Sequence, residues 1–397
     1  MRSAERRRAP LVVAVVVAAL IVLPLGARAL EPHLTRDTLW ANALASLGGT
    51  MKPGDFGYVF LVAGDDVLAG RSPYMDAEEF EGPPQAPYAY PPVLAILITP
   101  LSALPETMNG TFLPGVLFSL LLLAAMVGGL RLLDVRDWRC YPVALLAPVT
   151  LEAIEYGAIG PFLVLLVALA WRYRDLPRAA GAATGGLVVL KLFLWPLVVW
   201  LAFTQRLRAA VTAALFVGAL GLASWVVIAF RGFLEYPRLL RRLVDVEAEQ
   251  SYSAFALLRA LDVPELAARV FVLVGGVALL GLAWRAARDE RRRRLDRDRV
   301  SFGLALAAAL VLTPILWLHY LVLLFVPIAL ARPRLSWVWF VPLAMSVLEW
   351  RDWYRGWPRG ELDSLLSVAI VSALVLVVSL WSRPAAATGE LGGAARA

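Results

Sequence analysis

Long apolar stretches recur along this chain of 397 residues, from residue 10 to residue 382, and short polar or arginine-rich segments separate them. A stretch of about 20 apolar residues is long enough to cross the hydrocarbon part of a bilayer as an α-helix. No long polar block interrupts the series, so nothing in the pattern indicates a separately folded soluble domain. The pattern predicts a single all-α, polytopic membrane domain over residues 1–397, with about twelve transmembrane helices.

The composition agrees with a membrane protein, because 60% of the residues are hydrophobic and only 17% are charged. Soluble globular proteins are typically about 45–50% apolar and about 25% charged. The formal net charge is +7, from 38 basic and 31 acidic residues, and nearly all the basic ones are arginines. Such an excess fits either nucleic-acid binding or arginines that set the topology beside anionic lipids, and the apolar stretches favour the second interpretation. We therefore expect membrane lipids, and no nucleic acid, as partners.

Arginine-rich segments predict the orientation, because cytoplasmic loops of membrane proteins carry an excess of arginine and lysine. Residues 285–299 include four consecutive arginines, Arg291–Arg294, and are placed in the cytoplasm. Successive spans cross the membrane in opposite directions, so this segment fixes the side of all the others. We therefore expect a protein of the cell membrane with both termini in the cytoplasm and two large loops, 31–110 and 231–266, outside. The stretch 91–104 lies between prolines and is shorter than a crossing, so we expect it to be re-entrant or interfacial.

Three shorter segments have patterns of their own. Residues 9–25, preceded by arginines, predict an uncleaved first helix rather than a secretory signal peptide. Residues 233–246 carry arginines in an outer loop, against the charge rule, and their spacing predicts an amphipathic helix lying on the membrane surface. Residues 384–397 are small and polar, and we expect a disordered tail there.

The first outer loop, residues 31–110, has a regular pattern of aromatic, glycine and proline residues. Asp55 lies at the start of a predicted amphipathic helix that ends at Gly70, because glycine commonly terminates helices. Two roles fit this carboxylate. It either caps the helix N-terminus or, at the boundary of water and membrane, acts as general base on a substrate hydroxyl.

Ionisable residues within membrane segments are costly and commonly functional, and this chain has several. Lys191 stands in an otherwise apolar run, where it either snorkels to the interface or binds an anion. His319 is either a core histidine or a donor to a phosphate or sugar. Glu152 and Glu155 share a helix face at i, i+3, and they either face solvent or bind substrate. Arg259 is either an interfacial anchor or a ligand.

The sequence lacks motifs for metals, nucleotides and disulfides. Cys140 is the only cysteine, and the two histidines, His33 and His319, are far apart. The first outer loop has no Asp-x-Asp, and the adjacent Asp65 and Asp66 diverge on a helix. There is no phosphate-binding glycine loop and no dinucleotide fingerprint. We expect no metal, no cofactor and no intramolecular disulfide.

Six short motifs occur in an order that resembles glycosyltransferase family 87, the GT-C type polyprenyl-phosphate-mannose-dependent mannosyltransferases of actinobacteria. They are Asp-x-x-Tyr at 55–58, Leu-x-Gly-x-x-Pro-Tyr at 68–74, Tyr-x-Tyr-Pro-Pro at 88–92, Lys191 ahead of Pro196, Gln250-Ser251 ahead of Arg259, and Pro-x-x-Trp-x-His at 314–319. The resemblance covers residues 54–327. It implies a GT-C type glycosyltransferase fold, a bundle of membrane helices whose active site lies at the outer face around the first outer loop.

The resemblance also implies roles for single residues. Asp55 falls where the family has its catalytic aspartate, Lys191 where it has an intramembrane lysine, and His319 where it has a late histidine. The chain departs from the family pattern at 157–161, which lacks a common Gly-Gln, and at Glu249, where many members have asparagine. The expected substrate-binding residues are Lys191, His319, Arg259, Tyr58, Tyr90 and Glu155.

The activity implied by this family is transfer of a sugar, here mannose, from a polyprenyl-phosphate sugar donor to a hydroxyl of a cell-envelope glycolipid or polysaccharide on the outer face. The transfer is expected to invert the anomeric configuration, with Asp55 as general base. A membrane transporter or lipid flippase is the alternative, but the repeated halves with broken helices that this class commonly has are not found in the sequence. A non-catalytic membrane scaffold is a third alternative. It predicts that Asp55 and Lys191 can each be replaced without consequence for function.

Overall fold

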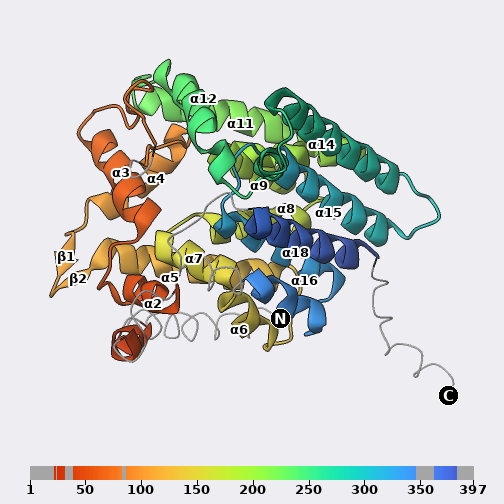
Figure 1. Ribbon diagram of the computed structural model, residues 1–397, viewed down its shortest axis with the longest axis horizontal. Coiled ribbons are helices and arrows are strands. Elements are labelled where there is room, and N and C mark those ends of the chain that lie inside the picture. The colour runs from red at the N-terminus through yellow and green to blue at the C-terminus, as the bar shows by residue number, and fades with distance from the viewer. Residues whose placement is uncertain (1–21, 24, 32–38, 83–85, 346–361, 382–397) are drawn as a thin grey trace.

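The computed structural model describes residues 22–23, 25–31, 39–82, 86–345 and 362–381. The predicted tail at 384–397 and most of the predicted first helix at 9–25 lie outside the described residues. Within the described ranges the chain is almost entirely helical (Figure 1). The one sheet found there pairs two short antiparallel strands, β1 (Thr107–Met108) and β2 (Thr111–Phe112). Asn109 and Gly110 connect them, both with positive φ, as a tight hairpin turn requires.

The helical elements follow one another with few long connections. In the first half of the chain they are α2 (Leu39–Gly48), η2 (Phe56–Phe60), α3 (Leu61–Leu68), α4 (Pro92–Ser102), α5 (Leu113–Leu132), α6 (Cys140–Leu145), α7 (Pro148–Tyr156), α8 (Gly160–Arg172), α9 (Pro177–Leu190), η3 (Leu192–Leu194) and α10 (Pro196–Phe203). In the second half they are α11 (Leu207–Val227), α12 (Glu235–Glu247), η4 (Ala248–Gln250), α13 (Ala254–Ala260), α14 (Glu265–Ala287), α15 (Arg294–Leu312), η5 (Leu318–Leu324), α16 (Phe325–Ala331), η6 (Trp337–Ala344) and α18 (Leu362–Trp381).

Four helices of the described residues, α5, α11, α14 and α18, are long and apolar enough to cross a membrane. Helices α7 and α8 pass the same test as a pair, but the chain bends by 117° between them. Gly157 ends α7 with a φ of 65°, a conformation that glycine adopts without steric cost. These helices confirm the prediction of a helical membrane protein. The number of about twelve crossings stays a prediction, because several apolar segments form only short or broken helices.

Helix α4 occupies the segment that was predicted not to cross the membrane. Its 11 residues rise about 16 Å, roughly half the thickness of the hydrocarbon core. Pro100 lies inside the helix and Pro91 precedes it. The helix packs against α3 and α11 instead of continuing through the bundle. Its length agrees with a re-entrant or interfacial segment.

Two pairs of helices lie side by side, α9 against α11 and α14 against α15 (Figure 1). Small residues allow α9 and α11 to approach closely. A Cβ atom added to Gly181 would lie 2.5 Å from Thr212, and one added to Gly185 would lie 2.8 Å from the carbonyl oxygen of Ala213. Small residues four positions apart on one face are a common means of close packing between membrane helices.

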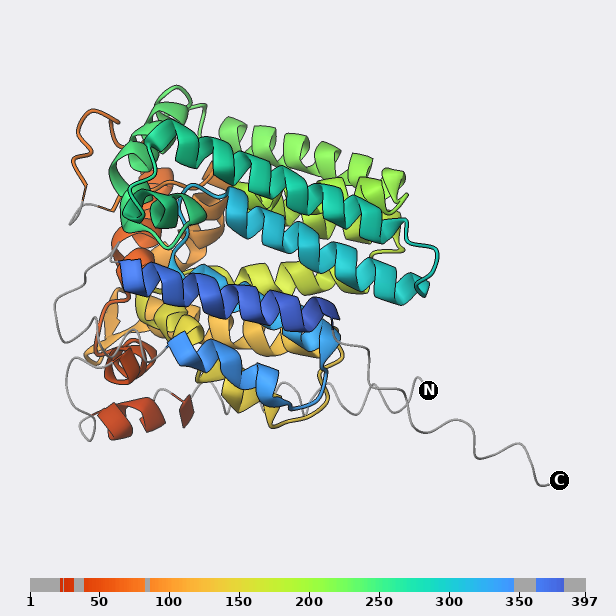
Figure 2. The ribbon, with the colours of Figure 1, turned by 45° about the vertical axis from the view of Figure 1, so that its right-hand side comes forward.

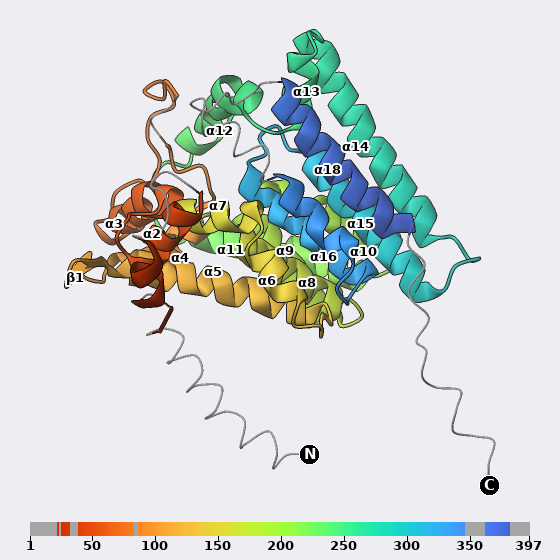
Figure 3. The same ribbon diagram turned by 60° about the horizontal axis from the view of Figure 1, so that its bottom comes forward.

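The two predicted outer loops meet at one end of the bundle. Figure 2 shows α3 and α4, in orange, at the same end as α12 and α13, in green. Helix α18 packs along α16 and α15 on another side of the bundle (Figure 3). The helices therefore bring two loop regions that are far apart in sequence to the same end of the bundle. The candidate site forms where these loop regions meet.

A buried cluster of ion pairs joins two helix connections and the start of α15 at the opposite end of the bundle. The Arg206 guanidinium lies 2.6 Å from the Asp298 carboxylate and 2.9 Å from Asp175, and Arg174 lies 3.2 Å from Asp298. The side chains of Arg206 and Asp298 are only 8% and 7% exposed. Burial opposes ionisation of Asp175, but its hydrogen bond with Arg206 and the charges of Arg206 and Arg294 hold its pKa below the ordinary value. The cluster fixes α9, α11 and α15 to one another where each begins.

We predict that Asp298→Asn lowers the free energy of unfolding by about 3–5 kcal/mol, because it leaves the buried Arg206 guanidinium without its closest countercharge. Equilibrium unfolding in mixed micelles measures this loss. Asp289→Asn is the matched control, since Asp289 pairs with Arg292 at 3.1 Å on the exposed surface, and its loss is expected to be about 0–1 kcal/mol. Equal losses in the two variants would show that the cluster contributes no more than a surface pair.

Candidate active site

A cavity of about 570 Å³ lies at the end of the bundle where the two loop regions meet. Its walls come from six segments that are far apart in sequence. They are residues 54–60, 86–91, 152–156, 190–193, 236–247 and 313–320. Five of the predicted catalytic and substrate-binding residues come together here, since this one cavity is lined by Asp55, Tyr58, Tyr90, Lys191 and His319.

Asp55 stands at the start of a helix whose next residues are buried in the core. The predicted helix is confirmed, and Gly70 follows its end with a φ of 67°. Its first turns form η2, a π-helix, a conformation that occurs frequently at functional sites. Phe56 and Phe60 are fully buried, and Phe56 stacks on Phe118 with ring centroids 4.2 Å apart. The Asp55 carboxylate is thus held at the cavity wall by a rigid element.

The helix-cap interpretation of Asp55 receives no support from the geometry. Among the described residues, its side chain makes no capping hydrogen bond to the helix that follows. The carboxylate instead lines the cavity and interacts electrostatically with the Lys191 ammonium. A capping residue would direct its oxygen atoms to the backbone N–H groups of the first helical turn.

Lys191 enters the cavity because the helix that carries it ends there. Helix α9 stops at Leu190, and Lys191 has an extended backbone with φ −148° and ψ 103° before Pro196 begins α10. Its Nζ lies 3.9 Å from the ring centroid of Tyr90 and 4.7 Å from that of Tyr320. The faces of aromatic rings attract cations, and the attraction grows when the cation is shielded from water. This position does not fit a lysine that snorkels to the lipid headgroups.

The two tyrosines below Lys191 are joined to each other. Their hydroxyl oxygens are 2.7 Å apart, a hydrogen bond between residues 90 and 320. Phe60 meets the Tyr90 ring edge to face at 5.1 Å, and Phe193 meets Tyr320 in the same way at 5.7 Å. Four separate segments are therefore needed to place one ammonium group.

His319 and Glu152 form a second polar pair in the cavity. The His319 Nδ1 atom lies 4.0 Å from the Glu152 carboxylate, and both side chains are almost fully buried. Gly160 makes room for this arrangement, because an added Cβ would lie only 2.5 Å from the carbonyl oxygen of His319. Glu152 was not among the expected site residues, although its buried position facing His319 gives it a better claim than Glu155.

Two expected substrate-binding residues do not line the cavity. Glu155 accepts a hydrogen bond of 2.8 Å from Asn42 of α2, which holds its carboxylate away from Glu152. Arg259 pairs with Glu249 at 2.7 Å and donates to the carbonyl oxygen of Val263. The hydrogen bond with Glu249 raises the pKa of the Arg259 guanidinium. Arg259 therefore stabilises the end of α13. This contact fits an anchoring residue better than a ligand of the substrate.

Tyr58 and three unexpected residues complete the polar lining. Tyr58 borders the cavity and is 63% exposed, so it lies at the mouth. Tyr320, Tyr156 and Thr313 also line the cavity, and none was expected from the sequence. Tyr320 directly follows His319, the end of the last motif, and an aromatic residue next to a candidate site residue is the signal that could have indicated it.

A cluster of aromatic residues supports the cavity wall formed by residues 86–91. The Tyr74 hydroxyl donates to the carbonyl oxygen of Tyr90 at 2.9 Å, and the Tyr88 hydroxyl donates to that of Pro91 at 2.7 Å. Tyr74 also stacks on Trp225 and contacts Tyr236 of α12. Burial raises the pKa of Tyr74 and Tyr236, so both phenols stay protonated.

The amphipathic helix predicted at 233–246 is confirmed as α12, but its apolar face covers the cavity. Tyr236, Leu240 and Leu243 line the cavity, and Leu239 is fully buried. The arginines on its other face are exposed. The apolar face of α12 therefore packs on protein, and its expected position on the membrane surface stays a prediction.

The fold defines a helical membrane protein with a mostly apolar cavity at one end, whose lining includes a carboxylate and a cation. The family model described as glycosyltransferase family 87 matches residues 88–314, more than half of the chain. The chain belongs to glycosyltransferase family 87 and is a membrane glycosyltransferase. No curated protein and no solved structure matches it. The family assignment removes the transporter and scaffold alternatives, whereas Asp55 and His319 lie outside the matched residues.

We predict different outcomes for the two glutamates of α7. Glu152→Gln should lower turnover about tenfold or more, because it removes the charge that faces His319 in the cavity. Glu155→Gln should keep nearly all activity, because the amide oxygen still accepts from Asn42. Initial rates of sugar transfer, with the unfolding temperature measured in parallel, check this. Equal rates in both variants would exclude a role for the Glu152 carboxylate in sugar transfer.

Proposed function

We propose that this glycosyltransferase moves a mannosyl group from polyprenyl-phosphate mannose to a hydroxyl of a cell-envelope glycolipid or polysaccharide. The proposed site is the cavity of Asp55 and Lys191, facing the outside of the cell membrane, with both termini in the cytoplasm. The observation that carries the proposal is that a carboxylate and an ammonium group, from segments far apart in sequence, share one cavity.

The donor's chemistry fits the lining of the cavity. A polyprenyl-phosphate sugar combines an anionic phosphate with a long apolar chain. Lys191, with His319 nearby, offers positive charge for the phosphate, and Leu190, Leu192 and Phe193 beside the lysine offer apolar contacts for the first isoprenyl units. Ionisable residues within membrane segments are costly and commonly functional, and the phosphate of the donor is a suitable anion for Lys191 to bind.

The proposed reaction is an inverting displacement at the anomeric carbon. The acceptor oxygen attacks this carbon as Asp55 removes its proton, and the bond between the carbon and the phosphate oxygen breaks. The electron pair leaves with the polyprenyl phosphate, whose added negative charge is stabilised by Lys191. Asp55 helps a second time as countercharge, because the sugar carries positive charge in an oxocarbenium-like transition state.

Incubation of the purified protein with labelled polyprenyl-phosphate mannose and cell-envelope glycolipid acceptors tests the proposal. Transfer without any nucleotide sugar is the expected result. A parallel incubation with a nucleotide-linked mannose is the control, because a site built for a lipid donor should not use it. Transfer from the nucleotide sugar alone would overturn the proposed donor class.

We predict that Asp55→Asn abolishes transfer and leaves folding intact. Loss of a positioned base typically lowers the rate by about 10²–10⁴-fold. The amide has almost the same size, so the unfolding temperature should stay within a few degrees. Asp65→Asn is the matched control, because Asp65 is exposed further along the same helix and does not line the cavity. More than about a tenth of wild-type turnover in Asp55→Asn would exclude the role of base.

We predict that Lys191→Ala raises the donor KM strongly, whereas Lys191→Arg keeps part of donor binding. The site needs positive charge, but the larger planar guanidinium fits poorly in a space that holds a compact ammonium. Lys52, the only other lysine, is the control. It pairs with Glu106 at 3.0 Å outside the cavity, and Lys52→Ala should leave the donor KM unchanged. An unchanged donor KM in Lys191→Ala would exclude phosphate binding by this lysine.

A further inference from the structure

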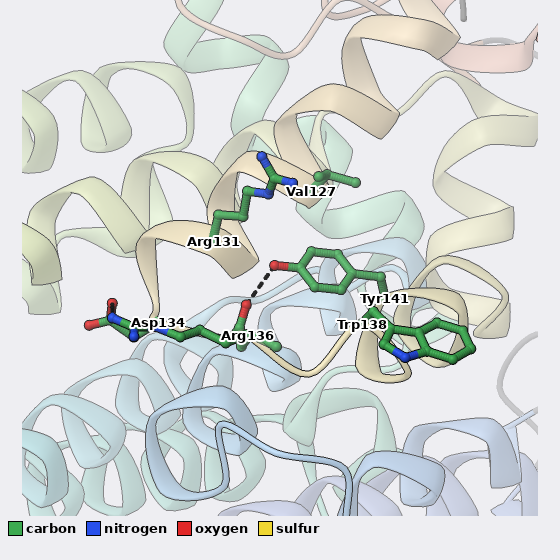
Figure 4. Close-up of a pocket in the computed structure, with 7 residues that line it drawn as sticks. Val127, Arg131, Asp134, Arg136, Trp138 and Tyr141 are labelled. Carbon is green, nitrogen blue, oxygen red and sulfur yellow. Dashed lines mark hydrogen bonds and ion pairs between the residues drawn. The ribbon is translucent and has the colours of Figure 1, made fainter. Parts of the chain in front are cut away.

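A second cavity, of about 600 Å³, lies at the far end of α5 and has no part in the transfer chemistry. It is formed by the last turn of α5, the connection after it and the start of α6 (Figure 4). Its lining combines the guanidinium groups of Arg131 and Arg136 with the aromatic rings of Trp138 and Tyr141. This mixture of cations and amphipathic rings differs from the lining of the first cavity.

The two cavities lie at opposite membrane boundaries. Helix α5 crosses the membrane by length and composition, and its first turns are near the first cavity, where Phe118 stacks on the Phe56 ring that follows Asp55. Arg131 is in its last turn. The 18 steps from Leu113 to Arg131 span about 27 Å, close to the thickness of the hydrocarbon core. The second cavity is therefore at headgroup level in the leaflet opposite the first.

Positive charge exceeds negative charge at this cavity. Arg131 and Arg136 are both exposed. The Asp134 carboxylate between them lies 3.4 Å from Arg172 and 3.9 Å from Arg136, so two guanidinium groups share this one carboxylate. Asp134 has a φ of 62°, and its N–H donates to the carbonyl oxygen of Arg131, which turns the chain sharply. The turn places two arginines at one opening. Guanidinium groups bind phosphate through paired hydrogen bonds.

The other wall of the cavity is aromatic and apolar. Trp138 is 74% exposed, unusually high for the largest apolar side chain. The Tyr141 hydroxyl donates to the carbonyl oxygen of Val135 at 2.6 Å, the dashed line in Figure 4. Tryptophan and tyrosine gather at membrane interfaces, where one part of the ring meets acyl chains and the other meets headgroups. Val127 of α5 extends the apolar surface toward the bilayer.

We propose that this second cavity binds the phosphate of an anionic glycerophospholipid from the leaflet opposite the active site. Arg131 and Arg136 hold the phosphate, and Trp138 and Val127 contact the first part of an acyl chain. Basic pockets at the ends of membrane helices recognise lipid headgroups in this way. The site is independent of the sugar transfer, and the lipid is a bound component and undergoes no reaction.

Lipid binding to the purified, delipidated protein in detergent tests this proposal, with native mass spectrometry counting bound lipids. The probes are phosphatidylglycerol and phosphatidylcholine with identical acyl chains. We expect retention of phosphatidylglycerol over phosphatidylcholine. In the double variant Arg131→Ala with Arg136→Ala, the affinity for phosphatidylglycerol should fall roughly tenfold or more. The variant with lysine at both positions should keep most of the affinity, because it keeps the charge.

Arg288→Ala is the matched control. Arg288 lies 4.8 Å over the Trp284 ring at the same end of another spanning helix, outside this cavity. It should retain the wild-type affinity, and an equal loss in this control would overturn the proposal. Displacement of phosphatidylglycerol by millimolar inorganic phosphate would overturn it too, since the site would then hold a free anion. The unfolding temperature without lipid shows that the exposed arginines were replaced without unfolding the protein.

Discussion

A single positive charge in an apolar part of the bundle is the constraint on which the candidate site depends. Lys191 stands between Leu190 and Leu192, and an ammonium group there is expensive unless the protein compensates it. The compensation comes from two tyrosine rings and one carboxylate, all from other segments. Helix α9 ends at Leu190, and Lys191 has an extended backbone where it lines the cavity.

This constraint explains why the loop regions are ordered around the cavity. Tyr90 reaches Lys191 only because the Tyr74 and Tyr88 hydroxyls hold the wall at residues 86–91 by its backbone carbonyls. Tyr74 in turn packs on Trp225 at the end of α11 and on Tyr236 of α12. The first and second loop regions are thus parts of one aromatic framework. The ion cluster at the other end of the bundle fixes the starts of the helices that carry it.

The sequence predicts those features that depend on the chemistry of a residue and its nearest neighbours. Apolar length indicated the membrane class, and a carboxylate before a glycine-terminated helix indicated Asp55. An isolated lysine in an apolar run indicated Lys191. The other features of the site depend on contacts between segments that are far apart in sequence. The spacing does not distinguish Glu152 from Glu155, whereas the contacts do, because Glu152 faces His319 and Glu155 binds Asn42 of α2.

Contacts between distant segments also limit how well the orientation and number of the helices can be predicted from the sequence. The apolar face of α12 predicts that something covers it, but the pattern does not distinguish lipid from a cavity of the same protein. Arg259 has the right neighbours for a ligand, yet Glu249, which replaces a common asparagine, holds its guanidinium. Short elements such as η5 and the bent pair α7 and α8 break the relation between apolar length and crossings.

The position of Asp55 shows how a residue in a predicted loop gains the rigidity that a catalytic role requires. The side chains of Phe56 and Phe60 point into the core and are completely buried, so the first turns after Asp55 belong to the bundle itself. Phe56 stacks on α5, and Phe60 meets the ring of Tyr90, which also lies under Lys191. The carboxylate and the ammonium are therefore fixed by neighbouring rings of one packed cluster. A shift of either group would require repacking of the core, and sites supported in this way hold their geometry better than sites on free loops.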